Sequence, residues 1–249
     1  MHISLKKMKN KKKHVLILGG SSDIAAEVIK NFLELRWDIT AHYFKNDKKL
    51  ISLRKKYKNL NLIQFDFSNY KDTQIEKKLK RKFNGKYDSI INLVGYIDNV
   101  GFENSNLKSI FRSLKANAIL PILIEQQLVK KMLVNNWGRI LNCSSIGVKF
   151  GGGYNSFNYA LSKHCLEFIP NSYKKWATKN VLINNLRIGI TKTKAHKRMK
   201  KNISMKERIK LIPMNRMADP KEIAIYITDL STEKNSYMTG QTLSASGGE

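Results

Sequence analysis

The sequence predicts an α/β protein with a single doubly wound domain, in which helices cover both faces of a parallel sheet of about seven strands. Apolar runs of strand length alternate with stretches of helical period over nearly all of the 249 residues. The run Tyr87–Val94 is almost continuously apolar, as expected for a strand that is buried on both faces. A chain of this length with 42% hydrophobic residues buries a large core, which excludes wholesale disorder.

The expected strands are short apolar segments bounded by polar or turn residues. They are His14–Leu18, Asp38–Phe44, Leu60–Phe65, Tyr87–Val94, Arg139–Cys143, Val181–Leu186 and Thr242–Ala245. Helices are expected between them, because apolar side chains recur there at intervals of three and four residues. They are an amphipathic helix through Ile24–Leu33, a lysine-rich helix before Leu60, a helix through Ile75–Phe83, two long helices at Leu107–Val134 and Tyr159–Lys179, and a last helix at Pro220–Leu230.

The organisation of the chain follows from this alternation. We expect a basic, solvated tail at residues 1–12, the domain at residues 13–249, and a flap at about 191–213, the longest stretch outside the alternation. No apolar segment has the length of a membrane span or a secretory signal. The two cysteines, Cys143 and Cys165, lack the spacing of a zinc site and indicate a reducing compartment, so we expect a cytoplasmic protein without a metal.

The net charge is strongly positive, since 46 lysines and arginines against 19 aspartates and glutamates give +27. Such an excess suits a nucleic acid, an acidic membrane surface or an acidic partner. However, 37 of the basic residues are lysine, whereas bidentate recognition of phosphate favours arginine. We therefore interpret the excess as compositional and expect no specific nucleic-acid partner.

The first strand ends in the turn Gly19-Gly20-Ser21-Ser22-Asp23-Ile24, which leads directly into a helix. Ligands of open parallel sheets bind beyond the carboxyl ends of the strands. Small residues there let the backbone approach a pyrophosphate, and the helix N-terminus offers free N–H groups. A glycine-rich turn is equally common as ordinary packing, so this motif alone leaves both interpretations open.

Tyr159 and Lys163 are four residues apart in an expected helix and therefore share one face. An ammonium beside a phenol favours the phenolate and lowers the pKa of the tyrosine toward the working pH. A pair with this spacing is common on protein surfaces. Here, however, Ser145 closes the preceding strand and Asn117 lies in the helix before it.

Taken together, these motifs resemble the short-chain dehydrogenase/reductase family, from about Lys13 to Glu249. The turn Leu18–Ala25 is similar to the family's Thr-Gly-x-x-x-Gly-x-Gly loop, and Asn92–Gly95 is similar to its Asn-Asn-Ala-Gly segment. Asn184–Thr193 corresponds to the stretch that normally contains Pro-Gly. The family's catalytic tetrad falls on Asn117, Ser145, Tyr159 and Lys163.

The resemblance implies a Rossmann-type fold and a reversible hydride transfer between a nicotinamide cofactor and a carbonyl or alcohol. Tyr159 is then the general acid, Lys163 lowers its pKa and binds the nicotinamide ribose, and Ser145 holds the carbonyl oxygen. Asn117 holds a water that passes protons to Lys163. The cofactor contacts that the resemblance implies are Gly19, Ser21, Ser22, Asp23, Ile24, Tyr43, Lys45, Asp66, Phe67, Asn92, Val94, Gly95, Tyr159, Lys163, Gly189 and Thr191.

Several positions depart from the family pattern. Asp23 stands where the loop usually has its middle glycine, and a carboxylate near a pyrophosphate is unfavourable unless it turns away. Arg187 precedes Ile188-Gly189 in place of the usual Pro-Gly. It is either the structural partner of a carboxylate, which we favour, or a charged wall of the substrate pocket.

The residues that end the second strand bear on the choice of cofactor. An acid there binds the ribose 2′-hydroxyl of NAD, and none is present before Asp47. Lys45 is instead able to meet a 2′-phosphate. We therefore expect NADP(H), with NAD(H) as the alternative.

The substrate is expected to be a carbonyl compound, either a small molecule or a carrier-linked one. The first interpretation is a 3-oxoacyl carrier-protein reductase, and the alternative is an oxidoreductase of sugar or surface-polysaccharide precursors. A third is a binding protein that kept the fold without turnover. The basic residues of the flap allow two interpretations: they attract an anionic substrate, or they form a solvated basic helix. We slightly favour the solvated helix. The residues concerned are Lys192, Lys194, His196, Lys197, Arg198, Lys200 and Lys201. The apolar surface of the two long helices predicts a homo-oligomer, a dimer or tetramer.

Overall fold

The computed structural model describes residues 12–45, 48–69, 73–194 and 204–249. In this part of the chain, seven strands form one sheet in the order β3-β2-β1-β4-β5-β6-β7, and every pairing is parallel. The strands are β1 (His14–Leu18), β2 (Asp38–Tyr43), β3 (Leu60–Gln64), β4 (Ser89–Asn92), β5 (Gly138–Ser145), β6 (Val181–Ile188) and β7 (Thr242–Ala245). The predicted doubly wound fold is confirmed, and the strand order reverses between β1 and β4, where such sheets bind ligands.

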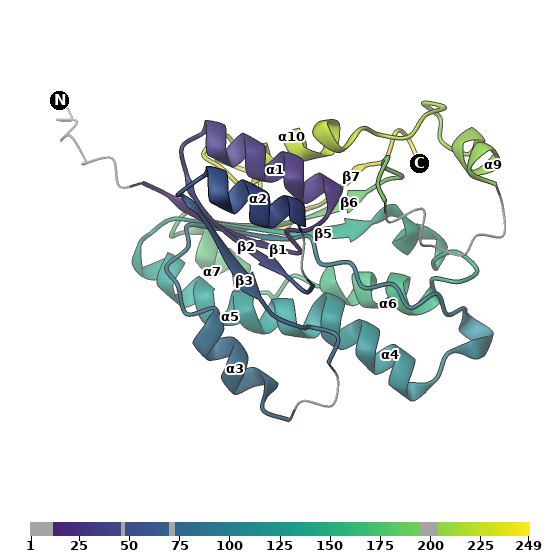
Figure 1. Ribbon diagram of the computed structural model, residues 1–249, viewed down its shortest axis with the longest axis horizontal. Coiled ribbons are helices and arrows are strands. Elements are labelled where there is room, and N and C mark those ends of the chain that lie inside the picture. The colour runs from purple at the N-terminus through teal and green to yellow at the C-terminus, as the bar shows by residue number, and fades with distance from the viewer. Residues whose placement is uncertain (1–11, 46–47, 70–72, 195–203) are drawn as a thin grey trace.

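Helices cover both faces of the sheet, as Figure 1 shows. One face carries α1 (Asp23–Glu34), α2 (Lys48–Lys56) and α10 (Pro220–Leu230), and the other carries α3 (Ile75–Lys82), α4 (Leu107–Leu114), α5 (Leu120–Val134) and α6 (Phe157–Leu166). Each layer has its own apolar core, with Phe32 buried in the first and Phe83 in the second. The shorter elements are η1 (Phe102–Asn104), η2 (Lys115–Ile119), η3 (Ile146–Phe150), α7 (Tyr173–Ala177) and α9 (Met205–Lys210).

Two of the expected elements differ from the structure. The helix expected at 159–179 is two helices, because α6 ends at Leu166 and α7 begins only at Tyr173. Pro170 lies between them; it has no N–H to donate and disfavours helical backbone in the residue before it. The helix expected at Leu107–Val134 is continuous in space, but its middle turn, η2, is a π-helix.

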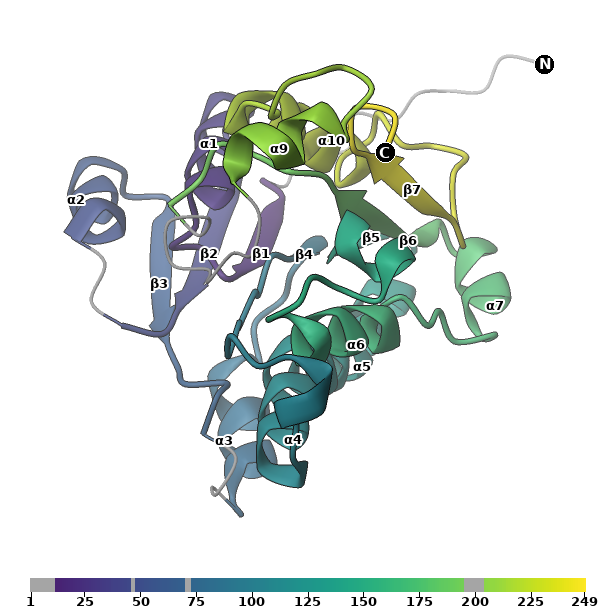
Figure 2. The same cartoon turned by 90° about the vertical axis from the view of Figure 1, so that its right-hand side faces the viewer.

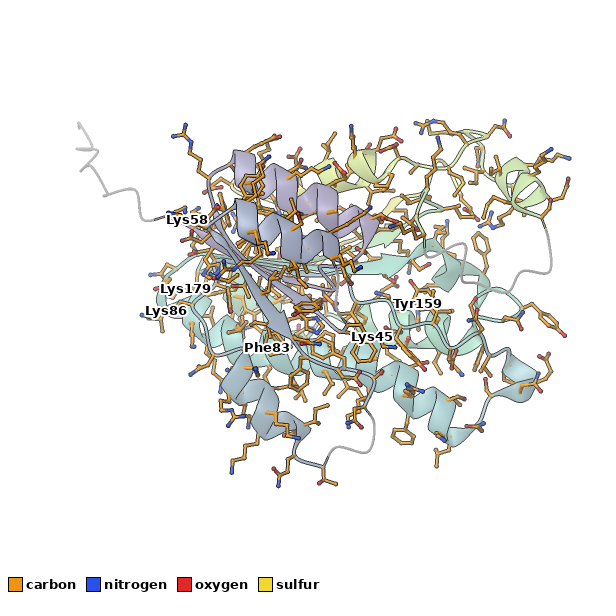
Figure 3. All side chains as sticks on the ribbon, viewed as in Figure 1. Lys45, Lys58, Phe83, Lys86, Tyr159 and Lys179 are labelled. Carbon is orange, nitrogen blue, oxygen red and sulfur yellow. The ribbon has the colours of Figure 1, made fainter. Side chains whose placement is uncertain are left out.

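Three lysines illustrate positive charge that lies away from the carboxyl ends of the strands. Lys58, Lys86 and Lys179 each precede the start of a strand, and Figure 3 shows them gathered at the end of the molecule opposite Tyr159. Of the expected basic tail only Lys12 is described, and residues 195–203 of the expected flap also lie outside the described residues. Among the described helices, none is long and apolar enough to cross a membrane.

Candidate active site

A cavity of about 1330 Å³ opens beyond the carboxyl ends of the central strands. Figure 2 looks onto this edge of the sheet, with α9 on one side and α6 on the other. Three residues predicted for the site do not line the cavity: Lys45, Asn92 and Asn117. The other predicted residues do line it, namely Gly19, Ser21, Ser22, Asp23, Ile24, Tyr43, Asp66, Phe67, Val94, Gly95, Ser145, Tyr159, Lys163, Gly189 and Thr191.

The glycine turn forms a cradle that fits a dinucleotide. Gly19 has a φ of +80°, and a Cβ there would lie 2.6 Å from the carbonyl oxygen of Leu93. Only glycine therefore lets β1 and β4 approach at this point. Helix α1 starts immediately afterwards, with Ser22 as its N-cap, whose hydroxyl accepts from Ala25 N at 3.0 Å. The helix N-terminus thus faces the cavity with its free N–H groups.

Asp23, the departure from the family's glycine loop, turns its carboxylate toward the flap. Its Oδ2 accepts a hydrogen bond from Lys194 N at 2.7 Å. The carboxylate is therefore engaged with the backbone just before residue 195. Asp23, which stands where the family usually has glycine, therefore connects the first turn of α1 to the flap.

His42, in β2, forms a hydrogen bond with the glycine turn. The sequence analysis did not single it out. Its Nδ1 accepts from Gly19 N at 3.2 Å, so the ring hydrogen lies on Nε2, which donates to Phe65 O at 2.9 Å. The ring stacks on Phe67 with centroids 4.1 Å apart. Burial lowers the pKa of His42 to about 4, which keeps the ring neutral. A polar residue within a strand buried on both sides was the signal available for it.

The far end of the cavity carries Asp66 and two lysines of α2. Asp66 Oδ1 accepts from the backbone N and the hydroxyl of Ser68, which fixes its carboxylate at the cavity wall. Lys45 lies over the ring of Phe44 instead, 5.2 Å from its centroid. Lys48 and Lys49, one turn further along the chain, line the cavity in its place. The cations that line this end of the cavity are therefore three and four residues after the lysine that the sequence suggested.

Tyr159 lies in the cavity wall within hydrogen-bond reach of Ser145. Burial raises the pKa of Tyr159 to about 12, although the Ser145 hydrogen bond opposes this shift. The expected lowering of this pKa by Lys163 is not found: desolvation is the main cause of the shift, and the Ser145 hydrogen bond is the influence that opposes it. Ser145 Oγ accepts from Gly147 N at 3.2 Å, which leaves its hydrogen to donate toward Tyr159 or a substrate oxygen.

Lys163 is 2% exposed, and its ammonium is held by two backbone carbonyls, one in β5 and one just after β4. Its Nζ donates to the carbonyls of Val94 at 2.7 Å and Cys143 at 2.6 Å. An ammonium has three N–H donors, so one remains for a group in the cavity. Burial lowers the pKa of Lys163 to about 8, so the amine is charged at neutral pH but close to its titration range.

Asn117 lies behind the cavity, in the π-helical turn η2. Its Oδ1 accepts from Tyr96 N at 2.7 Å, and its Nδ2 donates to Tyr96 O at 2.9 Å and to Ser162 Oγ at 2.8 Å. The side chain thus ties helix α6, which carries Tyr159 and Lys163, to the segment after β4. Widened helical turns of this type are frequent at functional sites.

The remaining residues that the sequence singled out make structural contacts around the cavity. Asn92 is fully buried, and its Oδ1 accepts from Val94 N at 3.1 Å. Gly189 packs on β7, because a Cβ there would lie 2.6 Å from the Cα of Ser246. Arg187 binds Glu167 through two hydrogen bonds, at 2.8 and 2.6 Å, which is the structural role that we favoured. Among the described residues, no group of three His, Cys, Asp or Glu could hold a metal ion.

The parallel sheet, the glycine cradle at its switch point and the Ser145, Tyr159 and Lys163 constellation define a Rossmann-type nucleotide-dependent oxidoreductase. A family model described as enoyl-(acyl carrier protein) reductase matches residues 19–249. The 3-oxoacyl-[acyl-carrier-protein] reductase FabG of Aquifex aeolicus is 32% identical over 180 residues, 68% of this chain and 72% of that protein. The chain belongs to the short-chain dehydrogenase/reductase family, whose members act on CH–OH or keto groups with NAD(P).

Solved structures agree with this fold. A 3-oxoacyl (acyl-carrier-protein) reductase from Agrobacterium tumefaciens with NADP bound superposes with a TM-score of 0.82 at 19% identity, over 99% of this chain and 100% of that one. ElxO with NADP bound gives a TM-score of 0.78 at 26% identity, over 96% of this chain and 98% of that one.

Proposed function

We propose that this protein is an NADPH-dependent reductase of 3-oxoacyl groups carried as thioesters. The observation that carries the proposal is the placement of Ser145, Tyr159 and Lys163 on one wall of a cavity that also contains the glycine cradle. The similarity to 3-oxoacyl carrier-protein reductases supports the choice of substrate class. When bound, the reduced nicotinamide supplies a hydride to the substrate carbonyl carbon.

The side chains of the site account for the proton and the developing charge. The Ser145 hydroxyl donates to the carbonyl oxygen and stabilises the negative charge that develops on it. Tyr159, protonated at neutral pH, gives its hydrogen to the same oxygen. The Lys163 ammonium stabilises the phenolate that remains. Asn117 keeps α6 in register with the segment after β4, so that these groups stay aligned.

The walls of the substrate half favour an acyl chain over a sugar. Apolar side chains of η3, the following loop and α9 line it, namely Phe150, Tyr154, Met205 and Leu211. Arg208 also lines this half, but it forms an ion pair with Glu249, and Lys210 pairs with Glu207 at 2.9 Å. Two of the five cations in the described part of the flap are therefore paired, and it is the apolar walls that support a neutral substrate portion here.

The experiment is to follow NADPH oxidation with acetoacetyl and longer 3-oxoacyl thioesters, and with keto-sugar nucleotides as the competing class. The proposal expects kcat/KM for the acyl thioesters to exceed that for the sugars by more than about tenfold. Efficient turnover of keto-sugars alone would replace the proposal with the alternative that the sequence left open.

Lys48 and Lys49 support the choice of NADP(H) over NAD(H), because they place cations beside the far end of the cavity near Asp66. Replacing both lysines by Gln should raise KM for NADPH about tenfold or more and leave KM for NADH nearly unchanged. Replacing Lys58, which follows α2 and does not line the cavity, is the matched control. Equal effects on both cofactors would contradict the assignment.

We further propose that the protein is a cytoplasmic homo-oligomer. Leu107 and Phe111 are one turn apart on α4 and are 72% and 53% exposed, and Ile122 on α5 is also exposed. An apolar stripe of this kind is typical of a surface that packs against a second copy. The unpaired cysteines, Cys143 and Cys165, support a reducing compartment. Light scattering that gives the mass of a single chain would contradict the oligomer.

A further inference from the structure

The side chain of Glu125, on α5, is a buried carboxyl that the site described above does not use. It is 8% exposed, and its Oε2 accepts from Asn142 Nδ2 at 3.4 Å, whereas no partner is found for Oε1. Glu125 follows Asn117 by eight residues, two helical turns, and therefore lies on the same helix face. Burial raises the pKa of Glu125 to about 8, and the hydrogen bond from Asn142 opposes this shift only in part. The side chain is thus mainly a neutral acid at pH 7.

Glu125 contacts one end of a polar layer that crosses the sheet. Asn92 on β4 and Asn142 on β5 are directly paired in register, and both are buried. Asn92 Nδ2 donates to Asn142 Oδ1 at 3.3 Å. Together with the Asn142–Glu125 contact, this bond connects α5, β5 and β4 in one chain of side chains. Apolar side chains of the core surround this layer, so each lost acceptor leaves a buried donor unpaired.

The chain of hydrogen bonds ends at the two carbonyls that hold Lys163. Asn92 Oδ1 accepts from Val94 N, and the carbonyl of the same Val94 accepts from Lys163 Nζ. The other acceptor of Lys163 is the carbonyl of Cys143, the residue directly after Asn142. Each carbonyl that accepts from the ammonium therefore lies one or two residues after an asparagine of the layer.

We propose that Glu125 is a positioning residue for Lys163. It anchors the layer to α5 and thereby keeps β4 and β5 at the spacing at which both carbonyls reach one ammonium. The third N–H of Lys163 then points into the cavity, where a cofactor ribose binds. The inference rests on the proposed reductase function, because the position of Lys163 matters through cofactor binding and turnover.

The test compares three variants of the full chain. Glu125→Leu removes the acceptor of Asn142, and Glu125→Gln keeps an acceptor at the same place. Val129→Ala, one turn further along the same face of α5, loosens the apolar core without touching the layer and is the control. The readouts are the hydrogen-exchange rate of the Val94 amide, NADPH affinity by fluorescence titration, and kcat.

We expect Glu125→Leu to speed exchange of the Val94 amide and to weaken NADPH binding about tenfold, with a matching loss of kcat. Glu125→Gln should restore all three values to within about threefold, and Val129→Ala should leave Val94 exchange and NADPH affinity unchanged. Asn142→Ser cuts the chain at the next link and should reproduce the effect of Glu125→Leu, which keeps the test decisive if that variant does not fold.

Wild-type exchange at Val94 and wild-type NADPH affinity in a folded Glu125→Leu or Asn142→Ser variant would overturn the proposal. So would equal losses in the Gln and Leu variants, or in the Val129→Ala control. The Val94 exchange rate and the NADPH affinity test the positioning role of Glu125 without any measurement of turnover. Failure of the proposed function is seen separately, as absence of NADPH oxidation by the unmodified protein with 3-oxoacyl thioesters.

Discussion

At the scale of single residues, the site separates two titrating groups by burial. Desolvation acts in opposite directions on an acid and a base, so it raises the pKa of Tyr159 to about 12 and lowers that of Lys163 to about 8. Tyr159 therefore keeps its proton over the whole neutral range. The amine of Lys163 is the first of the two to lose its proton as the pH rises.

Replacing Tyr159 by Phe should lower kcat for reduction by about 10²–10⁴-fold, because the general acid is lost while the ring remains. NADPH affinity, measured by fluorescence, should stay within about threefold of the wild-type value, since the glycine cradle is intact. Tyr154→Phe, which changes another tyrosine of the same cavity, is the control and should keep most activity. A Tyr159→Phe variant that also keeps most activity would rule out the assignment.

The rate of reduction should fall as the pH rises through about 8. Lys163 is charged below its pKa and neutral above it, and the charged form is the one that stabilises the Tyr159 phenolate. The measurement is kcat against pH from 6 to 10 with saturating NADPH. A rate that stays constant to pH 10 would show that the charge of Lys163 does not contribute.

At the scale of elements, β2 and the glycine turn are joined through His42. The neutral ring must accept from Gly19 N, and protonation removes that acceptor. The pKa of His42 is about 4 in the folded protein and 6.5 in an unfolded chain. The unfolded state therefore binds more protons between these pH values, and stability falls as the pH falls from 6.5 to 4.

This difference corresponds to about 3 kcal/mol of unfolding free energy lost across that window. Urea unfolding at pH 7 and pH 4.5 should show a larger loss in the wild type than in His42→Asn, whose amide does not titrate. The variant is expected to be less stable than the wild type at pH 7, because it loses the stacking on Phe67. An identical pH dependence in both proteins would exclude His42 as the source.

The elements that the sequence predicted best have strong local signals. Helix α10 has the predicted bounds, because Asp219 caps it, Pro220 occupies its first turn and Glu222 completes a capping box. The sequence analysis predicted one helix where the structure has α6 and α7, although Pro170 indicates a break. The helical spacing of apolar residues continues on both sides of Pro170, and this hid the break. The π-helical turn at Asn117 has no sequence signal, because its hydrogen bonds follow from contacts with Tyr96 and Ser162.

At the scale of the whole molecule, the sequence indicated the groups that we propose as catalytic, but it did not indicate the residues that support them. Ser145, Tyr159 and Lys163 end a strand or share a helix face, so order along the chain was enough to bring them together. The roles of His42 and Glu125 depend on which strands are neighbours, and neighbours such as β1 and β4 are far apart in sequence. The sequence did not indicate that Lys48 and Lys49 line the cavity, because the start of α2 decides which lysine reaches it.

Glu125 should make the whole fold less stable as the pH rises. Its pKa is about 8 when folded and 4.5 in an unfolded chain, so the unfolded state releases its proton first and gains stability between these pH values. Glu125→Gln keeps the hydrogen bond without the titration. The melting temperature of this variant should exceed that of the wild type at pH 8, with a smaller gain at pH 5. An equal gain at both pH values would contradict the argument.

The hydrogen bond between Asp23 and the backbone of Lys194 connects the two halves of the cavity. The carboxylate belongs to the first turn of α1, where the pyrophosphate of a dinucleotide is received, and its partner belongs to the segment that borders the substrate half. Two binding events that share one bond are thermodynamically linked, and the linkage is reciprocal. Binding at one half of the cavity that strengthens or breaks this bond would change the affinity of the other half by the same factor.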